Sequence, residues 1–342
     1  MKTRVLSGIR ATGRLHLGNY LGAVKGMLSL QDNPEQETFY MVADIHTITT
    51  PYRVEELRRN RREVVLDYLA AGLDPEKSVI FLQSDVSEHL ELAFYLSSVA
   101  TVAKMQHLPT YKDKVKQYPE HATMALLNYP LLMAADILIY KASLVPVGLD
   151  QEPHLEIARE IARRMNKDYG INFPEPKRFA TKGEYVPSLA GTGKMSKSVE
   201  GSYINLTDSL DDIKKALAHV VTDSGRGTVR KVEGRREYMY ENENGKLSDG
   251  VAALLKFVEL FQGSEKKREY DDQYDNEGIR YGDLKSELAE AIYAELEPIQ
   301  KRRAELEANP EYVDKVIREG AEKARVVASQ TVREVKEKMG LA

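Results

Sequence analysis

The first half of the chain alternates between short apolar runs and amphipathic stretches, and this alternation limits the possible folds more than any other feature. Two β-rich runs, 38–48 (TFYMVADIHTI) and 78–83 (SVIFLQ), flank a helical pattern at 54–71. Shorter apolar runs at 5–8 and 144–147 also precede helical patterns. Strand–helix alternation predicts an α/β fold, with a doubly wound parallel sheet covered by helices on both faces.

The second half of the chain has a different pattern. After about residue 206 the strand signals largely stop, and helical patterns cover 209–221, 251–261, 283–308 and 312–339. This change predicts a domain boundary between 1–205 and an all-helical C-terminal domain, 206–342. The charged, glycine-bearing segment 263–282 is expected to be a mobile loop. In the first half, a polar stretch with Pro109 and Pro119 separates two of the helical patterns.

Composition excludes several classes of chemistry. The 342 residues contain no cysteine, which excludes disulfides, thiolate zinc sites, iron–sulfur clusters and cysteine nucleophiles. No apolar run approaches the roughly 18 residues of a membrane span, and the start of the chain does not resemble a signal peptide. A cytoplasmic location is therefore expected. The net charge of −4 does not by itself indicate a nucleic-acid partner.

The first candidate motif is 10–19 (RATGRLHLGN), which directly follows the first predicted strand. In a doubly wound sheet the ligand crevice lies beyond the carboxyl ends of the strands, and a helix N-terminus there attracts phosphate. Gly18 would let a flat base or sugar approach the backbone, while His16 and Asn19 are short donors for phosphate oxygens. An ordinary helix start that contains a histidine and a glycine is the alternative.

The second candidate motif is 194–198 (KMSKS), in a loop with several glycines. Two lysines three residues apart suit a clamp on a polyphosphate whose charge grows in the transition state, and a loop can close on a nucleotide and release it afterwards. A solvated basic loop is the usual alternative for such a run. The first motif makes that alternative less attractive.

Together, HLGN and KMSKS resemble the two signature motifs of class I aminoacyl-tRNA synthetases. In that class the first motif commonly ends in His or Asn, here Asn19, and 194–198 matches the second motif letter for letter. The resemblance covers nearly the whole chain and is strongest to the bacterial tryptophanyl-tRNA synthetases. It implies a Rossmann-like catalytic domain (1–205) and an anticodon-binding domain (206–342), whose last helix packs back toward the catalytic domain.

A third pattern lies on one predicted helix. Tyr129, Met133, Asp136 and Tyr140 are spaced to share one helix face. A carboxylate in an otherwise apolar helix needs a partner, which can be a substrate donor or a structural Lys or Arg. The resemblance implies that Asp136 accepts the indole N–H of tryptophan. It also implies that Tyr129 holds the α-amino group together with Gln151, and that Met133 lines the pocket.

A fourth pattern, 147–151 (VGLDQ), lies at a predicted strand end. Asp150 can accept from ribose hydroxyls, and Gly148 permits close approach of a ligand. A strand-to-helix turn with Asp as the N-cap is the alternative. The family usually has Glu where this chain has Leu149, so a side-chain contact from that position is not assumed.

The resemblance extends the candidate site to further residues. Those implied for ATP binding are Arg10, Ala11, Thr12, Gly18, Asn19, Gly148, Leu149, Asp150, Val186, Lys194, Met195, Ser196, Lys197 and Ser198. Those implied for catalysis are His16, Asn19, Lys114, Lys194 and Lys197, and those implied for the amino acid are Leu6, His46, Tyr129, Met133, Asp136 and Gln151. No metal ligands are predicted. His46 can equally be a core histidine and Lys114 part of a solvated face, and many relatives have an aromatic residue in place of Leu6.

The implied activity is ATP-dependent activation of L-tryptophan, with Mg²⁺ in the ATP complex, followed by transfer to tRNA(Trp) by a homodimer. A site that pairs a substrate N–H rejects an analogue without it, so Asp136 would exclude phenylalanine better than tyrosine. A tyrosyl-tRNA synthetase is therefore the first alternative. A small-molecule nucleotidyltransferase and a non-catalytic RNA-binding paralogue are the others.

Overall fold

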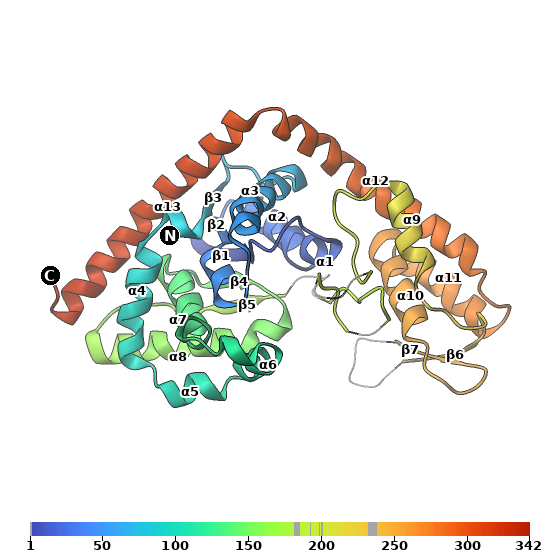
Figure 1. The fold of residues 1–342 in the computed structure, drawn as a ribbon, viewed down its shortest axis with the longest axis horizontal. Coiled ribbons are helices and arrows are strands. Elements are labelled where there is room, and N and C mark those ends of the chain that lie inside the picture. The colour runs from blue at the N-terminus through green and yellow to red at the C-terminus, as the bar shows by residue number, and fades with distance from the viewer. Residues whose placement is uncertain (1, 181–184, 192, 198, 200, 232–237) are drawn as a thin grey trace. The chain divides into compact units, whose positions relative to one another are not determined.

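The computed structural model describes residues 2–180, 185–191, 193–197, 199, 201–231 and 238–342 (Figure 1). The chain forms two compact units. The first, which we call the sheet unit, comprises Met1–Arg14, Ala23–Glu184 and Arg303–Ala342. The second, which we call the helical unit, comprises Leu15–Gly22 and Tyr185–Arg302.

The sheet unit is built on five parallel strands in the order β3-β2-β1-β4-β5. These are β1 (Thr3–Arg10), β2 (Gln36–Ala43), β3 (Ser78–Leu82), β4 (Leu144–Pro146) and β5 (Lys177–Phe179). The order runs in one direction from β1 to β3 and in the other from β1 to β5. Ligands of such sheets bind where the order reverses, beyond the carboxyl ends of the strands, which here means the segments that follow β1 and β4.

The helices of the sheet unit follow the strands in sequence. They are α2 (Lys25–Gln31), η2 (Ile45–Thr49), α3 (Val54–Ala71), η3 (Gln83–Asp85), α4 (Glu88–Leu96), η4 (Ser97–Val99), α5 (Val102–His107), α6 (Pro109–Gln117), η5 (Pro119–His121), α7 (Met124–Ile139), η6 (Leu149–Gln151), α8 (Glu152–Tyr169) and α13 (Pro310–Met339). The polar stretch with Pro109 and Pro119 is thus largely helical. Both prolines are the first residues of their helices, where the missing N–H costs nothing.

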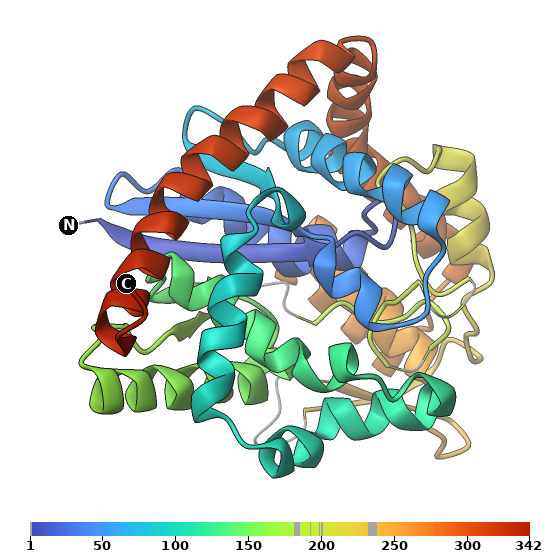
Figure 2. The same cartoon turned by 60° about the vertical axis from the view of Figure 1, so that its left-hand side comes forward.

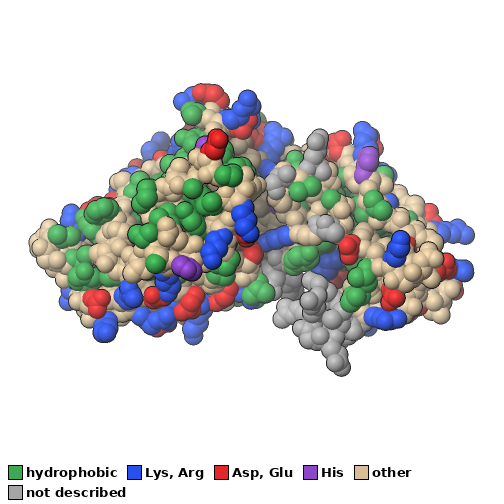
Figure 3. All heavy atoms as spheres, turned by 60° about the horizontal axis from the view of Figure 1, so that its bottom comes forward, with side chains coloured by type: hydrophobic (Ala, Val, Ile, Leu, Met, Phe, Trp, Pro, Cys, Tyr) green, Lys and Arg blue, Asp and Glu red, His purple; other side chains and the backbone are tan. Residues whose placement is uncertain are grey.

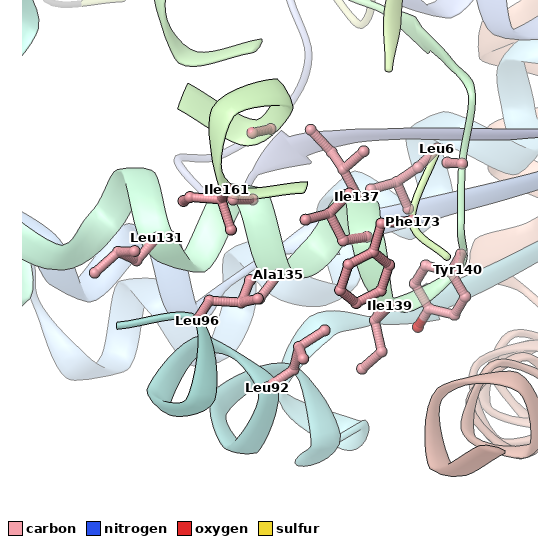
Figure 4. Close-up of a cluster of buried hydrophobic side chains, with 14 of the residues drawn as sticks. Leu6, Leu92, Leu96, Leu131, Ala135, Ile137, Ile139, Tyr140, Ile161 and Phe173 are labelled. Atoms are coloured by element: carbon pink, nitrogen blue, oxygen red, sulfur yellow. The ribbon is translucent and has the colours of Figure 1, made fainter. Parts of the chain in front are cut away.

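Alternating side chains send the two faces of the sheet into different cores. Leu6 of β1 and Phe39 of β2 are buried with α4, α7 and α8 in one large apolar cluster, part of which is shown in Figure 4. On the other face, the Tyr40 hydroxyl donates to the carbonyl of Met27 in α2, and Tyr68 of α3 accepts from the backbone N–H of Ile9. Helices cover both faces, which confirms the Rossmann-like, doubly wound sheet.

Helix α13 packs along β3 at the edge of the sheet (Figure 2). The contact is close because the helix presents small residues: an ideal Cβ on Gly320 would lie 1.7 Å from the Ile80 carbonyl oxygen. Ala324 and Ala328, one and two turns further along, are fully buried in the same cluster. An edge strand that is covered in this way is closed to pairing with another chain.

The helical unit contains α1 (Leu17–Asn19), α9 (Leu210–Ala218), β6 (Gly227–Lys231), β7 (Tyr238–Asn242), α10 (Asp249–Gln262), α11 (Ser264–Asp275) and most of α12 (Tyr281–Glu307). The π-helical turn η1 (Tyr20–Val24) continues α1 toward α2. The helical character of the C-terminal half is confirmed, and an antiparallel hairpin, β6–β7, is added to it.

The expectation of a mobile loop over 263–282 is wrong, because α11 occupies most of that segment. Its many charged residues hide a buried stripe formed by Lys267, Tyr270 and Tyr274, which recur at helical spacing. The Tyr274 hydroxyl donates to Asp223 over 2.6 Å. Burial of these rings, rather than helix propensity, explains why the segment is helical.

No helix among the described residues has both the length and the apolarity that a membrane span requires.

The packing of α13 on β3 predicts that Gly320→Ala destabilises the sheet unit. The new methyl group would overlap the Ile80 carbonyl, and overpacking of this kind costs about 1–3 kcal/mol in the free energy of unfolding. The control is Gly282→Ala in α12, where a Cβ would meet nothing within 4 Å; helix propensity there favours alanine by about 1 kcal/mol. Urea unfolding of the three proteins measures the difference, and equal stability of the two variants would contradict the packing.

Candidate active site

In the sheet unit, the Asp136 carboxylate on α7 is buried, with 1% of the residue exposed. Its Oδ1 accepts from Gln83 Nε2 over 2.8 Å and from His89 Nδ1 over 2.6 Å. Its Oδ2 accepts from His46 Nε2 over 2.8 Å. The carboxylate therefore has polar partners, but they are two histidines and an amide rather than the Lys or Arg of an ordinary structural salt bridge.

Burial by itself would raise the pKa of Asp136, because a carboxylate loses its hydration there. Hydrogen bonds from His46 and His89 outweigh burial and lower the pKa to about 2. The carboxylate is consequently ionised at neutral pH. A buried, charged acceptor of this kind recognises a donor N–H or O–H on an apolar ligand.

Two of the three donors to Asp136 directly follow strands of the sheet, and the third, His89, lies on α4. His46 lies in η2, just beyond β2, and Gln83 is the first residue of η3, just beyond β3. The Gln83 side-chain oxygen also accepts from the backbone N–H of Ile45 over 3.1 Å, which ties the two strand ends together. The predicted site residue His46 thus contacts the predicted site residue Asp136.

The hydroxyl of Tyr129, which lies about two turns before Asp136 on α7, belongs to a second polar cluster. It hydrogen-bonds with Thr110 of α6 and, over 2.5 Å, with His154 Nε2 of α8. His154 is 2% exposed. Burial lowers the pKa of His154, so its imidazole is neutral at pH 7. The amide of Gln151, which is predicted to hold the α-amino group together with Tyr129, donates to Asp150 over 2.8 Å.

In the segment after β4, Gly148 is the N-cap of η6. Leu149 and Asp150 in η6 are exposed, Leu149 at 64%. Asp150 thus lies at the edge of the sheet where ligands of this fold bind, with its carboxylate accessible to a hydroxyl donor.

At the end of β1, the Arg10 guanidinium donates to Thr50 Oγ1 over 2.9 Å. Its Nε is buried and has no hydrogen-bond partner among the described residues, and burial lowers its pKa. Ala11 is buried and its N–H donates to Thr47, whereas Thr12 is exposed. Burial and the charge on Arg10 lower the pKa of Lys114, so these two cations act on each other.

The remaining two residues predicted for the amino-acid pocket lie in or against the core. Leu6 is 2% exposed and belongs to the apolar cluster of Figure 4, while Met133 packs against that cluster and is partly buried.

In the helical unit, the HLGN segment is paired with the chain that follows the KMSKS loop. The Leu17 N–H donates to the Ile204 carbonyl over 2.9 Å, and the Leu206 N–H donates to the Leu15 carbonyl over 3.0 Å. This short antiparallel pairing fixes His16 between them. The Asn19 side chain closes the turn by accepting from the His16 N–H over 3.2 Å.

Gly18 lies against the imidazole ring of His16. An ideal Cβ at this position would come within 2.8 Å of His16 Cε1 and 3.3 Å of Met195 Cβ. Gly18 therefore leaves room for the His16 ring beside the KMSKS loop, which is a role that the sequence did not indicate. His16 Nδ1 is buried and has no hydrogen-bond partner among the described residues.

The KMSKS loop is anchored through its backbone. Met195 donates to the carbonyl of Val186 over 2.9 Å, and both side chains are buried. The Ser196 carbonyl accepts from the Ser202 hydroxyl over 2.6 Å. The loop thus holds Lys194 and Lys197 on a fixed backbone. Ser198, the last residue of the motif, lies outside the described residues.

The two lysines act electrostatically on His16. Burial lowers the pKa of His16, and the charges on Lys197 and Lys194 lower it further, to about 4. At neutral pH the imidazole is uncharged, and the positive charge near it comes from the lysines. Such a set provides cations and a neutral donor for the oxygens of a phosphate.

Four residues of these clusters were not assigned by sequence reasoning: Gln83, His89, Thr110 and His154. Gln83 and His89 carried a signal, since Gln83 directly follows an apolar strand and His89 lies at the start of a largely apolar helix, and polar residues in such positions are usually hydrogen-bonded when buried. Thr110 carried none, because its segment appeared to be an irregular polar stretch.

The doubly wound sheet, the polar groups beyond its strands, and the HLGN segment beside a KMSKS loop define a class I tRNA synthetase. The family described as "tRNA synthetases class I (W and Y)" matches residues 1–297, and the chain belongs to this family.

Relatives with the same organisation over the whole chain support this assignment. A tryptophan–tRNA ligase from Porphyromonas gingivalis is 42% identical, and the match covers 98% of each chain. The crystal structure of tryptophanyl-tRNA synthetase from Mycoplasma pneumoniae matches with a TM-score of 0.84 at 30% identity, over 100% of this chain and 99% of that one. That of Campylobacter jejuni, complexed with ADP and tryptophan, matches with a TM-score of 0.80 at 33% identity, over 99% and 100%.

The position of His16 predicts an unusually acidic titration. In ¹³C-histidine NMR, its midpoint should lie at about pH 4, well below the roughly 6.5 of an ordinary histidine. Lys197→Met should raise the midpoint because one repelling charge is lost, although burial keeps it below the ordinary value. Lys246→Met, which removes an exposed lysine that does not act on His16, should leave it unchanged. A midpoint near 6.5 in the unmodified protein would contradict the described geometry.

Proposed function

We propose that the protein is a tryptophan–tRNA ligase, which activates L-tryptophan with ATP and transfers it to tRNA(Trp). The observation that carries the choice of amino acid is the buried, ionised Asp136 on an otherwise apolar helix. Relatives of the same length that are named tryptophan–tRNA ligase support it.

The amino-acid site would lie around α7. Asp136 accepts the indole N–H, and Met133 and Leu6 border the ring. Tyr129 and Gln151 receive the α-ammonium group. Tyr129 hydrogen-bonds with His154 and Thr110, and Gln151 with Asp150. An α-ammonium group would replace partners of these side chains, so that the buried Tyr129 hydroxyl stays paired on binding.

We assign ATP contacts to Arg10, Ala11, Thr12 and Lys114, and the ribose contacts to Gly148, Leu149 and Asp150 in the segment after β4. The family resemblance also implies ATP contacts for His16, Gly18, Asn19, Val186, Lys194, Met195, Ser196, Lys197 and Ser198. Among the described residues, no three acidic or histidine side chains form a metal-binding group. We therefore assign Mg²⁺ to the triphosphate, as part of the MgATP substrate.

The reaction proceeds in two steps. A carboxylate oxygen of tryptophan attacks the α-phosphorus in line, the bond to the β-phosphate oxygen breaks, and pyrophosphate leaves. The terminal ribose hydroxyl of the tRNA then attacks the carbonyl carbon of the adenylate, and AMP leaves. No side chain acts as a nucleophile. His16, Asn19, Lys114, Lys194 and Lys197 stabilise the charge on the reacting phosphate and on pyrophosphate.

We also propose roles for the two parts of the chain, an oligomeric state and a cellular location. We assign residues 1–205 to catalysis, 206–342 to anticodon binding, and the working form to a cytoplasmic homodimer. Apolar side chains that suit burial against a second copy are present: Leu90 and Phe94, on one face of α4, are 51% and 76% exposed. Figure 3 shows hydrophobic side chains gathered among charged ones on one face of the molecule.

Amino-acid-dependent ATP–pyrophosphate exchange tests the function directly. We expect exchange with tryptophan, and less than one hundredth of that rate with phenylalanine, because phenylalanine leaves the Asp136 carboxylate unpaired; a site of this kind discriminates by about 10⁴-fold or more. Exchange that depends on tyrosine alone would establish a tyrosyl-tRNA synthetase instead. Folded protein that is silent with all three amino acids would contradict the assignment.

The KMSKS lysines separate an enzyme from a non-catalytic RNA-binding protein. Lys194→Ala and Lys197→Ala should each lower the rate of adenylate formation about 10²–10³-fold, the usual loss for one transition-state donor. Affinity for tRNA(Trp) should remain within about threefold, since one phosphate contact is worth little at physiological salt. Single-turnover kinetics and filter binding measure the two quantities, with Lys246→Ala as the control. Unchanged rates in both variants would remove the proposed role of the loop.

A further inference from the structure

His89 is a buried histidine to which neither the proposed mechanism nor the sequence gives a role. It lies on α4 with no exposed surface. Its Nδ1 is 2.6 Å from Asp136 Oδ1, and its Nε2 is 2.8 Å from the Tyr140 hydroxyl. The His89 imidazole therefore bridges the carboxylate to Tyr140, the residue that directly follows α7.

The direction of these hydrogen bonds follows from the chemistry of Tyr140. Burial raises the pKa of Tyr140 well above its usual range, and the charge on Asp136 raises it further, so the hydroxyl keeps its proton. Among the described contacts, His89 Nε2 is the only acceptor for that proton. His89 Nε2 is thus an acceptor, and its ring proton lies on Nδ1, where it is donated to Asp136.

The two carboxylate oxygens consequently have different surroundings. Oδ1 accepts from both His89 and Gln83, which are fully buried. Oδ2 accepts, among the described residues, from His46 alone, and the side chain of His46 is 12% exposed. A carboxylate oxygen has about two acceptor positions, so Oδ1 is saturated, and Oδ2 retains one position that none of the described contacts fills.

We propose that His89, with its tautomer fixed by Tyr140, is a positioning residue for tryptophan recognition. It saturates Oδ1 and keeps the carboxylate ionised, so that Oδ2 is the oxygen that accepts the indole N–H. This inference rests on the proposed function of Asp136. It adds a residue that does not touch the substrate and acts only through the carboxylate.

Two substitutions of nearly equal size separate the two ends of the His89 ring. His89→Asn places an amide N–H where Nδ1 donates to Asp136, whereas His89→Gln places its amide near the Nε2 position and removes that donor. We expect His89→Gln to raise KM for tryptophan about tenfold or more, because a hydrogen bond to a charged group is lost. His89→Asn should restore KM to within about threefold of the unmodified protein. KM for ATP should be unchanged in both.

The pH profile gives a second readout that a merely structural role would not change. The groups that face Asp136 are His46 from η2, Gln83 from η3, and His89 and Tyr140 from α4 and α7. When the donor at His89 is lost, burial raises the pKa of Asp136. The ratio of kcat/KM for tryptophan, His89→Gln to unmodified protein, should therefore fall as the pH is lowered from 8 to 5.5. The same ratio for His89→Asn should stay flat.

The controls keep the inference falsifiable. His219→Gln, at an exposed position in the helical unit, should behave as the unmodified protein in both assays. Tyr140→Phe, which removes only a hydroxyl, frees the tautomer of His89 and should raise KM for tryptophan several-fold even if His89→Gln fails to fold. Folded His89→Gln or Tyr140→Phe with unchanged KM and flat pH ratios would overturn the inference. Absence of tryptophan-dependent exchange in the unmodified protein would instead overturn the proposed function.

Discussion

The ionised carboxylate of Asp136, buried on an apolar helix, is the constraint on which the amino-acid side of the site depends. An unpaired buried carboxylate costs several kcal/mol or more, so the fold must deliver donors to it. They come from three elements: η2 after β2, η3 after β3, and α4. Meeting this requirement fixes where the ends of two strands lie relative to α7. The polar site and the apolar core are continuous through Tyr140, whose ring packs in the apolar cluster and whose hydroxyl hydrogen-bonds with His89.

The residues proposed to bind the nucleotide differ from Asp136 in charge, because their buried ionisable group is neutral rather than charged. In the helical unit the cations are lysines on a loop whose backbone is anchored, while the buried His16 stays neutral because burial and those same lysines disfavour its protonation. Neutrality suits the role proposed for His16, which is to donate to a phosphate oxygen without binding the product pyrophosphate as tightly as a third cation would. Gly18 contributes by making room for the ring. The segment is thus shaped by the position of one imidazole as much as by the approach of a ligand.

The sequence predicted the sheet and its helices because their signals are local: apolar runs of strand length and amphipathic stretches of helix length. It also predicted that Asp136 needs a partner, since that follows from one residue in its own helix. It could not identify Gln83 and His89 as partners of Asp136, or Thr110 as a partner of Tyr129, because their approach depends on how separate elements pack. The error at α11 has a similar cause. Its tyrosines stabilise a helix only when they are buried against β6, β7 and α10, which are separate elements.

Selection of tryptophan over tyrosine is the more demanding task for such a site. A carboxylate rejects phenylalanine because nothing pairs with it, but a phenol O–H can donate as an indole N–H does. The charge of Asp136 therefore does not distinguish an indole N–H from a phenol O–H. The distinction must come from the position of the carboxylate oxygen that accepts the donor. The hydrogen bonds that Oδ1 accepts from His89 and from the amide of Gln83 hold the carboxylate in place, and Tyr140 in turn holds His89. The carboxylate therefore has little freedom to rotate toward a donor in another position. With the role proposed for Asp136, specificity would arise from the rigidity of the acceptor, and residues that do not touch the substrate would determine which aromatic side chain can pair with it.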